Sequence, residues 1–299
     1  MGTASRPAVD VLIVSFNTKS LLRDCLCSIF LHPPPCESIE VVVSVFDNGS
    51  PDGSAEVVAE EFPQVRLVRS DENLGFGQAM NILAATSTAT YLMPLNSDTL
   101  WPGDIVTPLV DFLEREPDVA IVSPRLISPD GTLQLSSEDM PGVGFEFALM
   151  LHGTRFARIP RLWDATAIVR RVRQAERAGE LEPRDTEFVW ATCWLLRRGL
   201  VEQFGLFDEA FVLYDEDLDF CFRLRKRGAR IVYYPSVTLI HLGGASSTYE
   251  RKRLAMQRGR RLYYRRNHGR MALLAYRLAT EGIGSVQRLT ARIRCADRR

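Results

Sequence analysis

The sequence lacks the long apolar segments on which membrane-spanning proteins depend. In its 299 residues, no unbroken apolar run approaches the roughly eighteen residues of a transmembrane helix. The first residues, Met1–Pro7, also lack the apolar core of a secretory signal peptide. We therefore expect the protein to stay in the cytoplasm.

Several patterns that mark other classes of protein are missing as well. The chain contains no Walker loop and no Gly-x-Ser-x-Gly elbow, which argues against a P-loop nucleotidase and an α/β-hydrolase. Its cysteines lack the paired spacing of a zinc site and fall in apolar or amphipathic segments. We expect buried, reduced thiols at these six positions, Cys25, Cys27, Cys36, Cys193, Cys221 and Cys295.

The net charge is zero, but the charges are distributed unevenly. Residues 250–299 carry fifteen Lys or Arg and three acidic residues, a net charge of +12, so the first 249 residues are correspondingly acidic. A basic tail on an acidic body indicates a nearby anionic surface. We expect phospholipid headgroups at the inner face of the plasma membrane rather than a nucleic acid. A solvated helix or a contact between identical subunits stays open for this tail.

The apolar pattern alternates between strand-like and helix-like segments up to residue 122. This alternation predicts an α/β fold with a mostly parallel, Rossmann-like sheet wrapped by helices. We assign it to a domain of residues 1–249, followed by a basic helical extension of residues 250–299. The predicted strands are 9–14, 39–46, 65–68, 91–95 and 119–122, and the predicted helices are 21–29, 54–62, 77–85 and 105–113.

The second half of the chain is less regular. Pro129-Asp130-Gly131 predicts a hairpin turn, and no core architecture is readable over residues 136–186, apart from an exposed helix expected at 170–184. Further on, the pattern predicts a strand at 188–196, a helix from about Asp215 to Gly228, and two short strands, 231–234 and 237–240, that flank Pro235.

Two aspartates directly follow predicted strands, where parallel sheets gather their ligands. Asp98 could hold a divalent cation, although Asn96-Ser97-Asp98 is also a typical turn or helix cap. Asp47 could accept the imide N–H of a uracil or thymine ring, although Asp-Asn-Gly-Ser is also an Asx turn. Asn73-Leu74-Gly75-Phe76-Gly77 precedes a helix, so its backbone amides could approach a diphosphate.

A second acidic group lies in Asp215-Glu216-Asp217-Leu218-Asp219, at the start of a predicted helix. The helix dipole would stabilise these carboxylates, but mutual repulsion would also raise the proton affinity of one of them towards that of a general base. His241 follows a later strand and could supply a neutral imidazole to a metal, or be a structural residue. Trp190 and Trp194 could stack on a sugar, and a core role is open for either.

These residues occur in an order that resembles family 2 inverting glycosyltransferases, and most of all their bacterial rhamnosyltransferase branch. The resemblance covers roughly residues 9–247. Its motifs are Val11-Leu12-Ile13-Val14-Ser15-Phe16-Asn17, Asp47-Asn48-Gly49-Ser50, Asn73-Leu74-Gly75-Phe76-Gly77, Leu95-Asn96-Ser97-Asp98-Thr99, Gly205-Leu206-Phe207-Asp208-Glu209, Tyr214-Asp215-Glu216-Asp217-Leu218-Asp219 and His241.

The resemblance implies a GT-A fold, a dTDP- or UDP-linked sugar donor, and Mg²⁺ or Mn²⁺ held by Asp98 and His241. It implies that Asp217, beside Glu216, is the catalytic base and that Asp47 reads the pyrimidine. Two departures are Asn96, where the family often has Asp, and Ala191-Thr192-Cys193-Trp194 in place of Gly-Ala-Cys-Met. The other positions that it assigns to the donor are Ser15, Asn17, Asn73, Gly75, Gly77, Asn96 and Ser97.

The resulting hypothesis is an inverting glycosyltransferase of cell-wall or polysaccharide biosynthesis. It would move a sugar, L-rhamnose from dTDP-L-rhamnose by analogy, onto a hydroxyl of a glycan or lipid-linked acceptor. One alternative is a sugar nucleotidylyltransferase, although that class would place a glycine-rich loop with a basic residue where Ser15-Phe16-Asn17-Thr18 stands. Another is a non-enzymatic sugar-binding or scaffold protein on the same fold.

Overall fold

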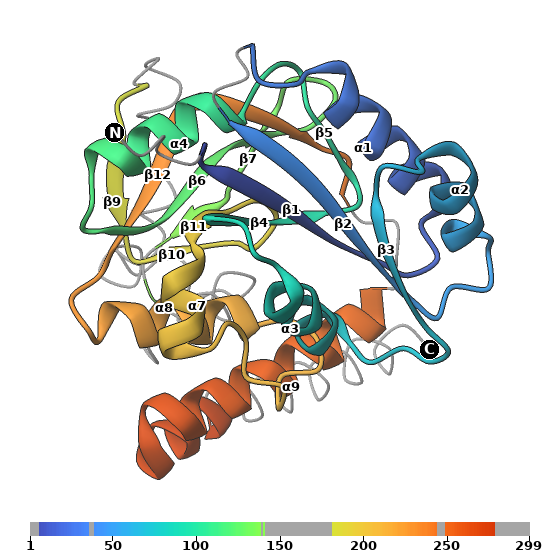
Figure 1. Ribbon diagram of the computed structural model, residues 1–299. Helices are drawn as coiled ribbons and strands as arrows, with labels where there is room; N and C mark the ends of the chain where they lie inside the picture. The colour runs from blue at the N-terminus through green and yellow to red at the C-terminus, as the bar shows by residue number, and fades with distance from the viewer. Residues whose placement is uncertain (1–5, 36–38, 139, 141–180, 244–248, 279–299) are drawn as a thin grey trace, which may run out of the picture.

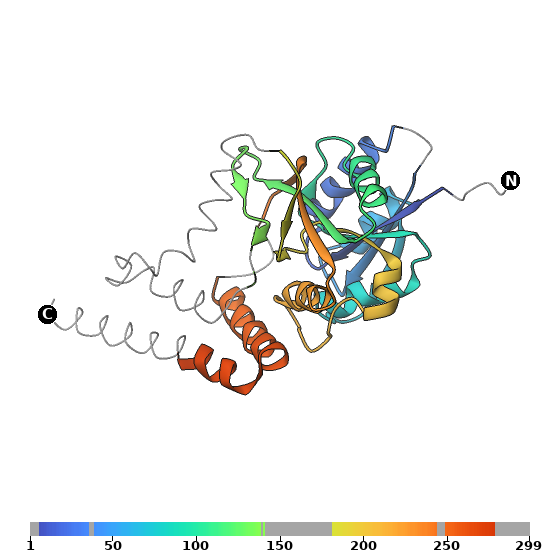
Figure 2. The same ribbon diagram turned by 90° about the vertical axis from the view of Figure 1, so that its left-hand side faces the viewer.

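A central β-sheet separates two sets of helices in the computed structural model (Figures 1 and 2). The structure describes residues 6–35, 39–138, 140, 181–243 and 249–278. The part of the helix predicted for 170–184 that precedes residue 181 lies outside these ranges, as do Cys36 and Cys295. The three-layer arrangement agrees with the predicted α/β fold.

The sheet is parallel in its first half and mixed in its second. The first four strands are parallel, β11 is antiparallel to both of its neighbours, and β12 runs parallel to β6. The order across the sheet is β3 (Arg66–Ser70), β2 (Glu40–Asn48), β1 (Ala8–Ser15), β4 (Tyr91–Asn96), β11 (Leu195–Arg197), β6 (Val119–Ile127), β12 (Arg230–His241) and β5 (Thr99–Leu100).

Both faces of the sheet are covered, because alternate residues of its apolar strands point to opposite sides. In β1, Val11 and Ile13 join the core on one face and Leu12 joins the core on the other. The first face is covered by α1 (Lys19–Leu31), α2 (Ser54–Glu61) and α4 (Val106–Arg115), and the second by α3 (Phe76–Thr86), α7 (Arg198–Phe204), α8 (Glu216–Arg225) and α9 (Tyr249–Asn267) (Figure 1).

The hairpin predicted at residues 129–131 is confirmed. β7 (Leu133–Gln134) pairs antiparallel with the end of β6, and Gly131 takes the positive φ of 81° that the turn needs. Short strands complete this side of the domain: β8 (Ser137–Glu138), β9 (Arg184–Thr186) and β10 (Phe188–Val189), with β10 paired to β8.

Three details of the sequence prediction are wrong. The single strand predicted at 188–196 is two strands, β10 and β11, separated by a turn whose amide and carbonyl groups bond to neighbouring segments instead of to a ladder. The two strands that flank Pro235 form one strand, β12, with an irregularity between Tyr234 and Thr238, where proline lacks an N–H. Cys27 is exposed, whereas Cys25, Cys193 and Cys221 are buried free thiols as predicted.

The predicted helical tail contributes to the core. Tyr263 and Tyr264 of α9 are fully buried and belong to the same apolar cluster as α3 and α8. The described residues include no helix that is long and apolar enough to cross a bilayer.

Candidate active site

The predicted donor residues lie at the carboxyl end of the parallel strands. β1 pairs with β2 on one side and with β4 on the other, so the strand order reverses direction at β1. Ser15 is opposite Asp47 across one pair, and Val14 is opposite Asn96 across the other. Open α/β sheets bind ligands at such a switch point.

Asp47 combines a turn role with a free acceptor. Its Oδ2 accepts the backbone N–H of Ser50 at 3.1 Å, which is the Asx turn expected from the sequence. Its Oδ1 is buried and has no hydrogen-bond partner in the described residues. A buried, unpaired carboxylate oxygen is costly, so it fits a site that accepts an N–H from a ligand. Asn17 lies beside this turn and donates its backbone N–H to the Ser50 hydroxyl at 3.1 Å.

A chain of hydroxyl groups connects the ends of β1 and β4. Ser15 Oγ lies 2.9 Å from Thr18 Oγ1, which lies 3.1 Å from Ser97 Oγ. All three side chains are buried. Two of the predicted donor residues therefore share a network through Thr18, which sequence reasoning did not select.

The loop before α3 is shaped by Asn48 and two glycines. Asn48 donates to Asn73 Oδ1 at 3.2 Å and accepts the N–H of Leu74 at 2.8 Å. Gly75 has a φ of 85°, and a Cβ there would lie 2.8 Å from the carbonyl oxygen of Val212. A Cβ on Gly77 would lie 3.4 Å from that of Phe207. The glycines thus let the predicted donor loop pack against residues 207–212, the segment that leads into the acidic group.

The side chains of Asp98 and His241, the two predicted metal ligands, face one another. His241 Nε2 lies 3.3 Å from Asp98 Oδ1, because β12 pairs His241 with Thr99 of β5. His241 Nδ1 lies 2.7 Å from Gln134 Oε1, while Gln134 Nε2 donates to the His241 carbonyl at 2.8 Å. That second bond fixes the orientation of the amide, so Nδ1 is the donor and Nε2 points at the carboxylate.

These residues fit a divalent cation with only two protein ligands. No group of three or more metal-ligating side chains occurs among the residues described. Mg²⁺ and similar ions keep several waters and bind substrate phosphates, so one carboxylate and one imidazole are a sufficient protein share. Gln134 was missed by sequence reasoning, since nothing in the sequence relates residue 134 to residue 241.

Asp217 and Glu216 are adjacent but their environments differ. Asp217 is partly exposed; its Oδ1 accepts the N–H of Leu218 at 2.8 Å and its Oδ2 accepts the N–H of Ala191 at 3.1 Å. Loss of water around its carboxylate nevertheless raises the pKa of Asp217 to about 6. Glu216 is buried with Oε2 unpaired in the described structure, and burial raises its pKa well above the usual value. Asp217 therefore loses its proton more readily than Glu216.

A short segment ties Asp217 to the end of β4. Ala191 donates its N–H to Asp217, and the carbonyl of the next residue, Thr192, accepts the N–H of Asn96 at 3.0 Å. Cys193 then forms a β-bridge with Leu95. Through these contacts the acidic group is connected to Asn96-Ser97-Asp98, although the two lie far apart in the sequence.

Backbone strain is concentrated in these segments. Among the non-glycine residues that the structure describes, those with positive φ are Asn17, Tyr214 and Asp215, at 56°, 68° and 66°. Strained conformations persist where surrounding structure enforces them, and they are typical of ligand sites. All three lie in segments with predicted site residues.

The two tryptophans lie in different environments. Trp194 is 0% exposed and packs between Phe207 and Phe220, with ring centroids 6.0 Å away in both cases, so it has no surface to offer a sugar. Trp190 is 39% exposed at the turn that carries Ala191. A separate cavity of about 320 Å³ between α3 and α7 is lined by none of the predicted site residues.

Comparison with protein families agrees with this arrangement. The sequence model of Glycosyl transferase family 2 matches residues 10–205. The chain belongs to this family. It is 31% identical over 214 residues to an N-acetylglucosaminyl-diphospho-decaprenol L-rhamnosyltransferase of Mycobacterium tuberculosis, a match that covers 67% of this chain and 66% of that protein, just under two thirds of the relative's length.

Solved structures of other proteins share the fold of this chain. One is GalNAc-T7 with UDP, GalNAc and Mn²⁺, with a TM-score of 0.60 and 14% identity over 87% of this chain and 48% of that one. Another is the mannosyltransferase PcManGT from Pyrobaculum calidifontis with GDP-Man and Mn²⁺, with a TM-score of 0.56 and 18% identity over 96% of this chain and 80% of that one. The likeness shows a GT-A fold, as predicted.

Proposed function

We propose that this family 2 protein is an inverting glycosyltransferase that moves a sugar from a nucleoside diphosphate onto an acceptor hydroxyl. The observation that carries the proposal is the bridge from Asp217 through Ala191 and Thr192 to Asn96. It connects an ionised carboxylate of raised pKa to the strand end that carries Ser97 and Asp98. A general base and a diphosphate site are the two parts that the reaction needs.

Asp217 would act by a single displacement. Its carboxylate takes the proton of the acceptor hydroxyl, whose oxygen bonds to the anomeric carbon from the face opposite the diphosphate. The bond from that carbon to the diphosphate oxygen breaks, and the nucleoside diphosphate leaves with the bonding electrons. The two backbone N–H bonds to Asp217 orient its carboxylate while the raised pKa keeps it basic.

Asp98 and His241 would hold Mg²⁺ or Mn²⁺. Such an ion, when bound, offsets the negative charge that develops on the leaving diphosphate. Gln134 would keep the imidazole in the tautomer with Nε2 free to coordinate. Both solved structures named above contain Mn²⁺, which supports this assignment.

The similar rhamnosyltransferase and Asp47 support a proposal for the donor and the acceptor. We propose dTDP-L-rhamnose as donor, supported by the L-rhamnosyltransferase of 31% identity, with the buried Oδ1 of Asp47 accepting the imide N–H of the pyrimidine. The name of that relative includes a diphospho-decaprenol acceptor, which supports a lipid-linked acceptor here. Trp190 would contact the acceptor sugar, whereas the buried Trp194 would support this surface from inside the protein.

Replacement of Asp217 tests the activity. Asp217→Asn keeps shape and loses basicity, so nucleoside diphosphate release should fall by about 10²-fold or more while the donor, screened by thermal shift with Mn²⁺, binds almost as before. Asp24→Asn, on the exposed side of α1, is the matched control and should behave as wild type. Normal transfer by Asp217→Asn would disprove the assignment of Asp217 as the base. If the wild type releases no nucleoside diphosphate with any donor, a non-enzymatic protein would be favoured.

The basic C-terminal region would bring the protein to an anionic membrane. Met271 and Leu274 are exposed on a helical stretch, residues 269–278, that also exposes Arg270. An apolar edge beside cationic side chains suits the surface of an anionic bilayer. Whole-tail deletion would unseat Tyr263 and Tyr264 from the core, so point variants are the better probe.

Vesicle co-sedimentation measures this association. The wild type should pellet with phosphatidylglycerol vesicles and less with phosphatidylcholine vesicles. A double variant, Met271→Ser with Leu274→Ser, should pellet several-fold less. The control Leu31→Ser, which changes an exposed leucine at the end of α1, should have no effect. Equal pelleting of wild type and double variant would eliminate this role.

A further inference from the structure

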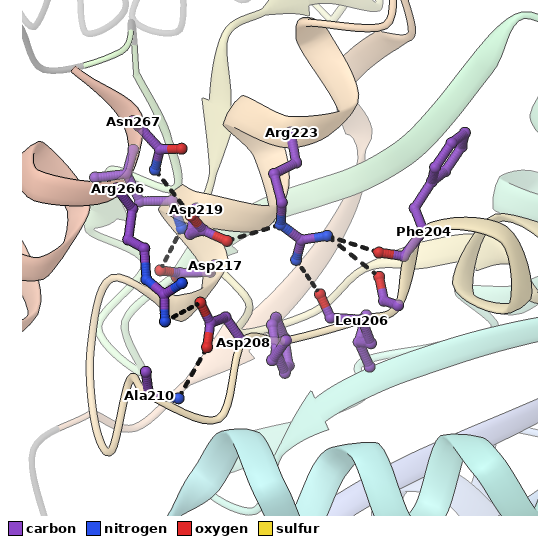
Figure 3. Close-up of polar contacts among 12 residues, drawn as sticks. Phe204, Leu206, Asp208, Ala210, Asp217, Asp219, Arg223, Arg266 and Asn267 are labelled. Atoms are coloured by element: carbon purple, nitrogen blue, oxygen red, sulfur yellow. Dashed lines mark hydrogen bonds and ion pairs between the residues drawn. The ribbon is translucent and has the colours of Figure 1, made fainter. Parts of the chain in front are cut away.

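Helix α9 lies against the acidic segment and holds two of its carboxylates. Arg260 contacts Asp215 Oδ1 through Nη2 at 3.0 Å and Nε at 3.2 Å. Asn267, two turns further on, donates from Nδ2 to Asp219 Oδ1 at 2.8 Å. Figure 3 shows Asn267 and Asp219 meeting beside Asp217. The contacts therefore reach residues two positions before and two positions after the proposed base.

The close approach of α9 depends on a glycine. A Cβ on Gly259 would lie 2.5 Å from the carbonyl oxygen of Tyr214 and 2.9 Å from Asp215 Oδ2. The helix backbone is thus pressed against the two residues that adopt positive φ at the start of α8. A contact this tight fixes the entry of the chain into the first turn of α8.

The carboxylates of Asp215 and Asp219 differ in how many of their oxygens have a partner. Asp219 is paired on both oxygens, because Oδ2 also contacts Arg223 Nε at 2.7 Å, and Arg223 in turn donates to the carbonyls of Phe204 and Leu206 (Figure 3). Asp215 is buried and its counterion is Arg260, while its Oδ2 has no hydrogen-bond partner in the described residues. Asp215 is therefore the carboxylate that depends on α9.

On the basis of the proposed role of Asp217, we propose that Arg260 is a positioning residue of the active site, acting through Asp215. The pair would do two things. It holds the strained turn at Asp215, which orients Asp217 in the first turn of α8. It also keeps a negative charge two residues from the base.

The Arg260–Asp215 pair should shift the pKa of Asp217 in a definite direction. Burial raises the pKa of Asp215 and Arg260 opposes this rise, so the contact with Arg260 favours the ionised form of Asp215. The charge of Asp215 in turn contributes to the raised pKa of Asp217, after burial itself. In the part of the chain that the structure describes, Asp217 also faces Glu216, the Cys221 thiol and the amide of Leu218 from α8, and the amide of Ala191 from the turn before β11. Loss of charge at Asp215 should thus lower the pKa of the base.

Two substitutions should therefore act alike. Asp215→Asn removes the charge directly, and Asn tolerates the left-handed backbone at this position. Arg260→Gln removes the counterion, so the buried Asp215 should take up a proton at neutral pH. Arg260→Lys keeps the charge and should restore most of the wild-type behaviour. Arg266→Gln is the matched control, since Arg266 is on the same helix but pairs with Asp208 at 3.3 Å.

The measurement is the pKa of Asp217 by NMR titration of ¹³Cγ-labelled aspartates, assigned with Asp217→Asn. We expect it to move below the wild-type value of about 6 in Asp215→Asn and in Arg260→Gln, and to stay unchanged in Arg266→Gln. The acid limb of the pH profile of kcat/KM should move by the same amount. Because the base is displaced, kcat of Arg260→Gln should fall about 10- to 100-fold while the donor KM stays unchanged.

An Asp217 pKa that stays at the wild-type value in both variants would overturn the proposal, as would an equal shift in Arg266→Gln. The NMR readout separates this proposal from the proposed function. If the pKa shifts appear but the wild type transfers no sugar, the transferase assignment fails, whereas the coupling of Arg260 to Asp217 through Asp215 stands. If sugar is transferred and the shifts are missing, the reverse holds.

Discussion

Gly259 provides a direct test of how α9 docks on the site. A Cβ at this position would need the Tyr214 carbonyl oxygen to move from 2.5 Å to at least 3.0 Å, the shortest separation that Cβ atoms adopt. The neighbour is backbone and cannot rotate away as a side chain would. Gly259→Ala must therefore push α9 outward or distort the turn that precedes Asp217.

The free energy of this change is the sum of two opposing effects. Alanine is favoured over glycine within a helix by about 1 kcal/mol. Forcing an extra methyl group into a packed contact costs about 1–3 kcal/mol. We expect Gly259→Ala to be neutral to about 2 kcal/mol less stable than the wild type, with kcat lowered more than the stability change alone would suggest.

Gly199 in α7 is the matched control, since a Cβ there would meet no atom within 4 Å. Gly199→Ala should gain up to about 1 kcal/mol from helix propensity, so the two variants should differ by about 1–3 kcal/mol in urea unfolding. If Gly259→Ala is stabilised as much as Gly199→Ala and keeps its turnover, α9 does not pack on Tyr214 and Asp215 as described.

Three further predictions concern the site itself. Because a base must be ionised to act and the pKa of Asp217 is about 6, kcat/KM should be constant well above pH 6 and fall about tenfold per pH unit below it; a flat profile down to pH 5 would contradict the assignment. Gln134→Leu should weaken Mn²⁺ binding about 10- to 100-fold in a calorimetric titration without donor, and His241→Ala should weaken it at least as much; unchanged affinity in both would remove the metal from this pair. Trp194→Ala should destabilise the fold by about 3–5 kcal/mol, whereas Trp190→Ala should change stability by less than about 1 kcal/mol and raise the acceptor KM; similar losses of stability in urea would show that both belong to the core.

The strands and helices of the first half of the chain could be predicted because local pattern and tertiary burial agree there. β1 is apolar at successive positions because both faces of the sheet are covered, and α4 presents a clear apolar stripe to one of them. The donor residues could be placed at strand ends for the same reason, since topology alone brings the ends of β1, β2 and β4 together.

The remaining parts of the site depend on contacts between segments that have no local signature. The run at 188–196 reads as one strand, but Ala191 and Thr192 direct their backbone groups to Asp217 and Asn96. Nothing in the sequence pairs Arg260 with Asp215, 45 residues away. The tail reads as a separate basic extension because its charges dominate its composition, and they conceal the two tyrosines that anchor it.

The burial of Tyr263 and Tyr264, two residues of α9, determines when the core can close during synthesis of the protein. The ribosome must release these tyrosines before the apolar layer under α3 and α8 can close. Translation products that stop short of them would display that layer to water, and chaperones and proteases recognise such surfaces. A closed core and resistance to degradation should thus be gained together, once both tyrosines have left the ribosome.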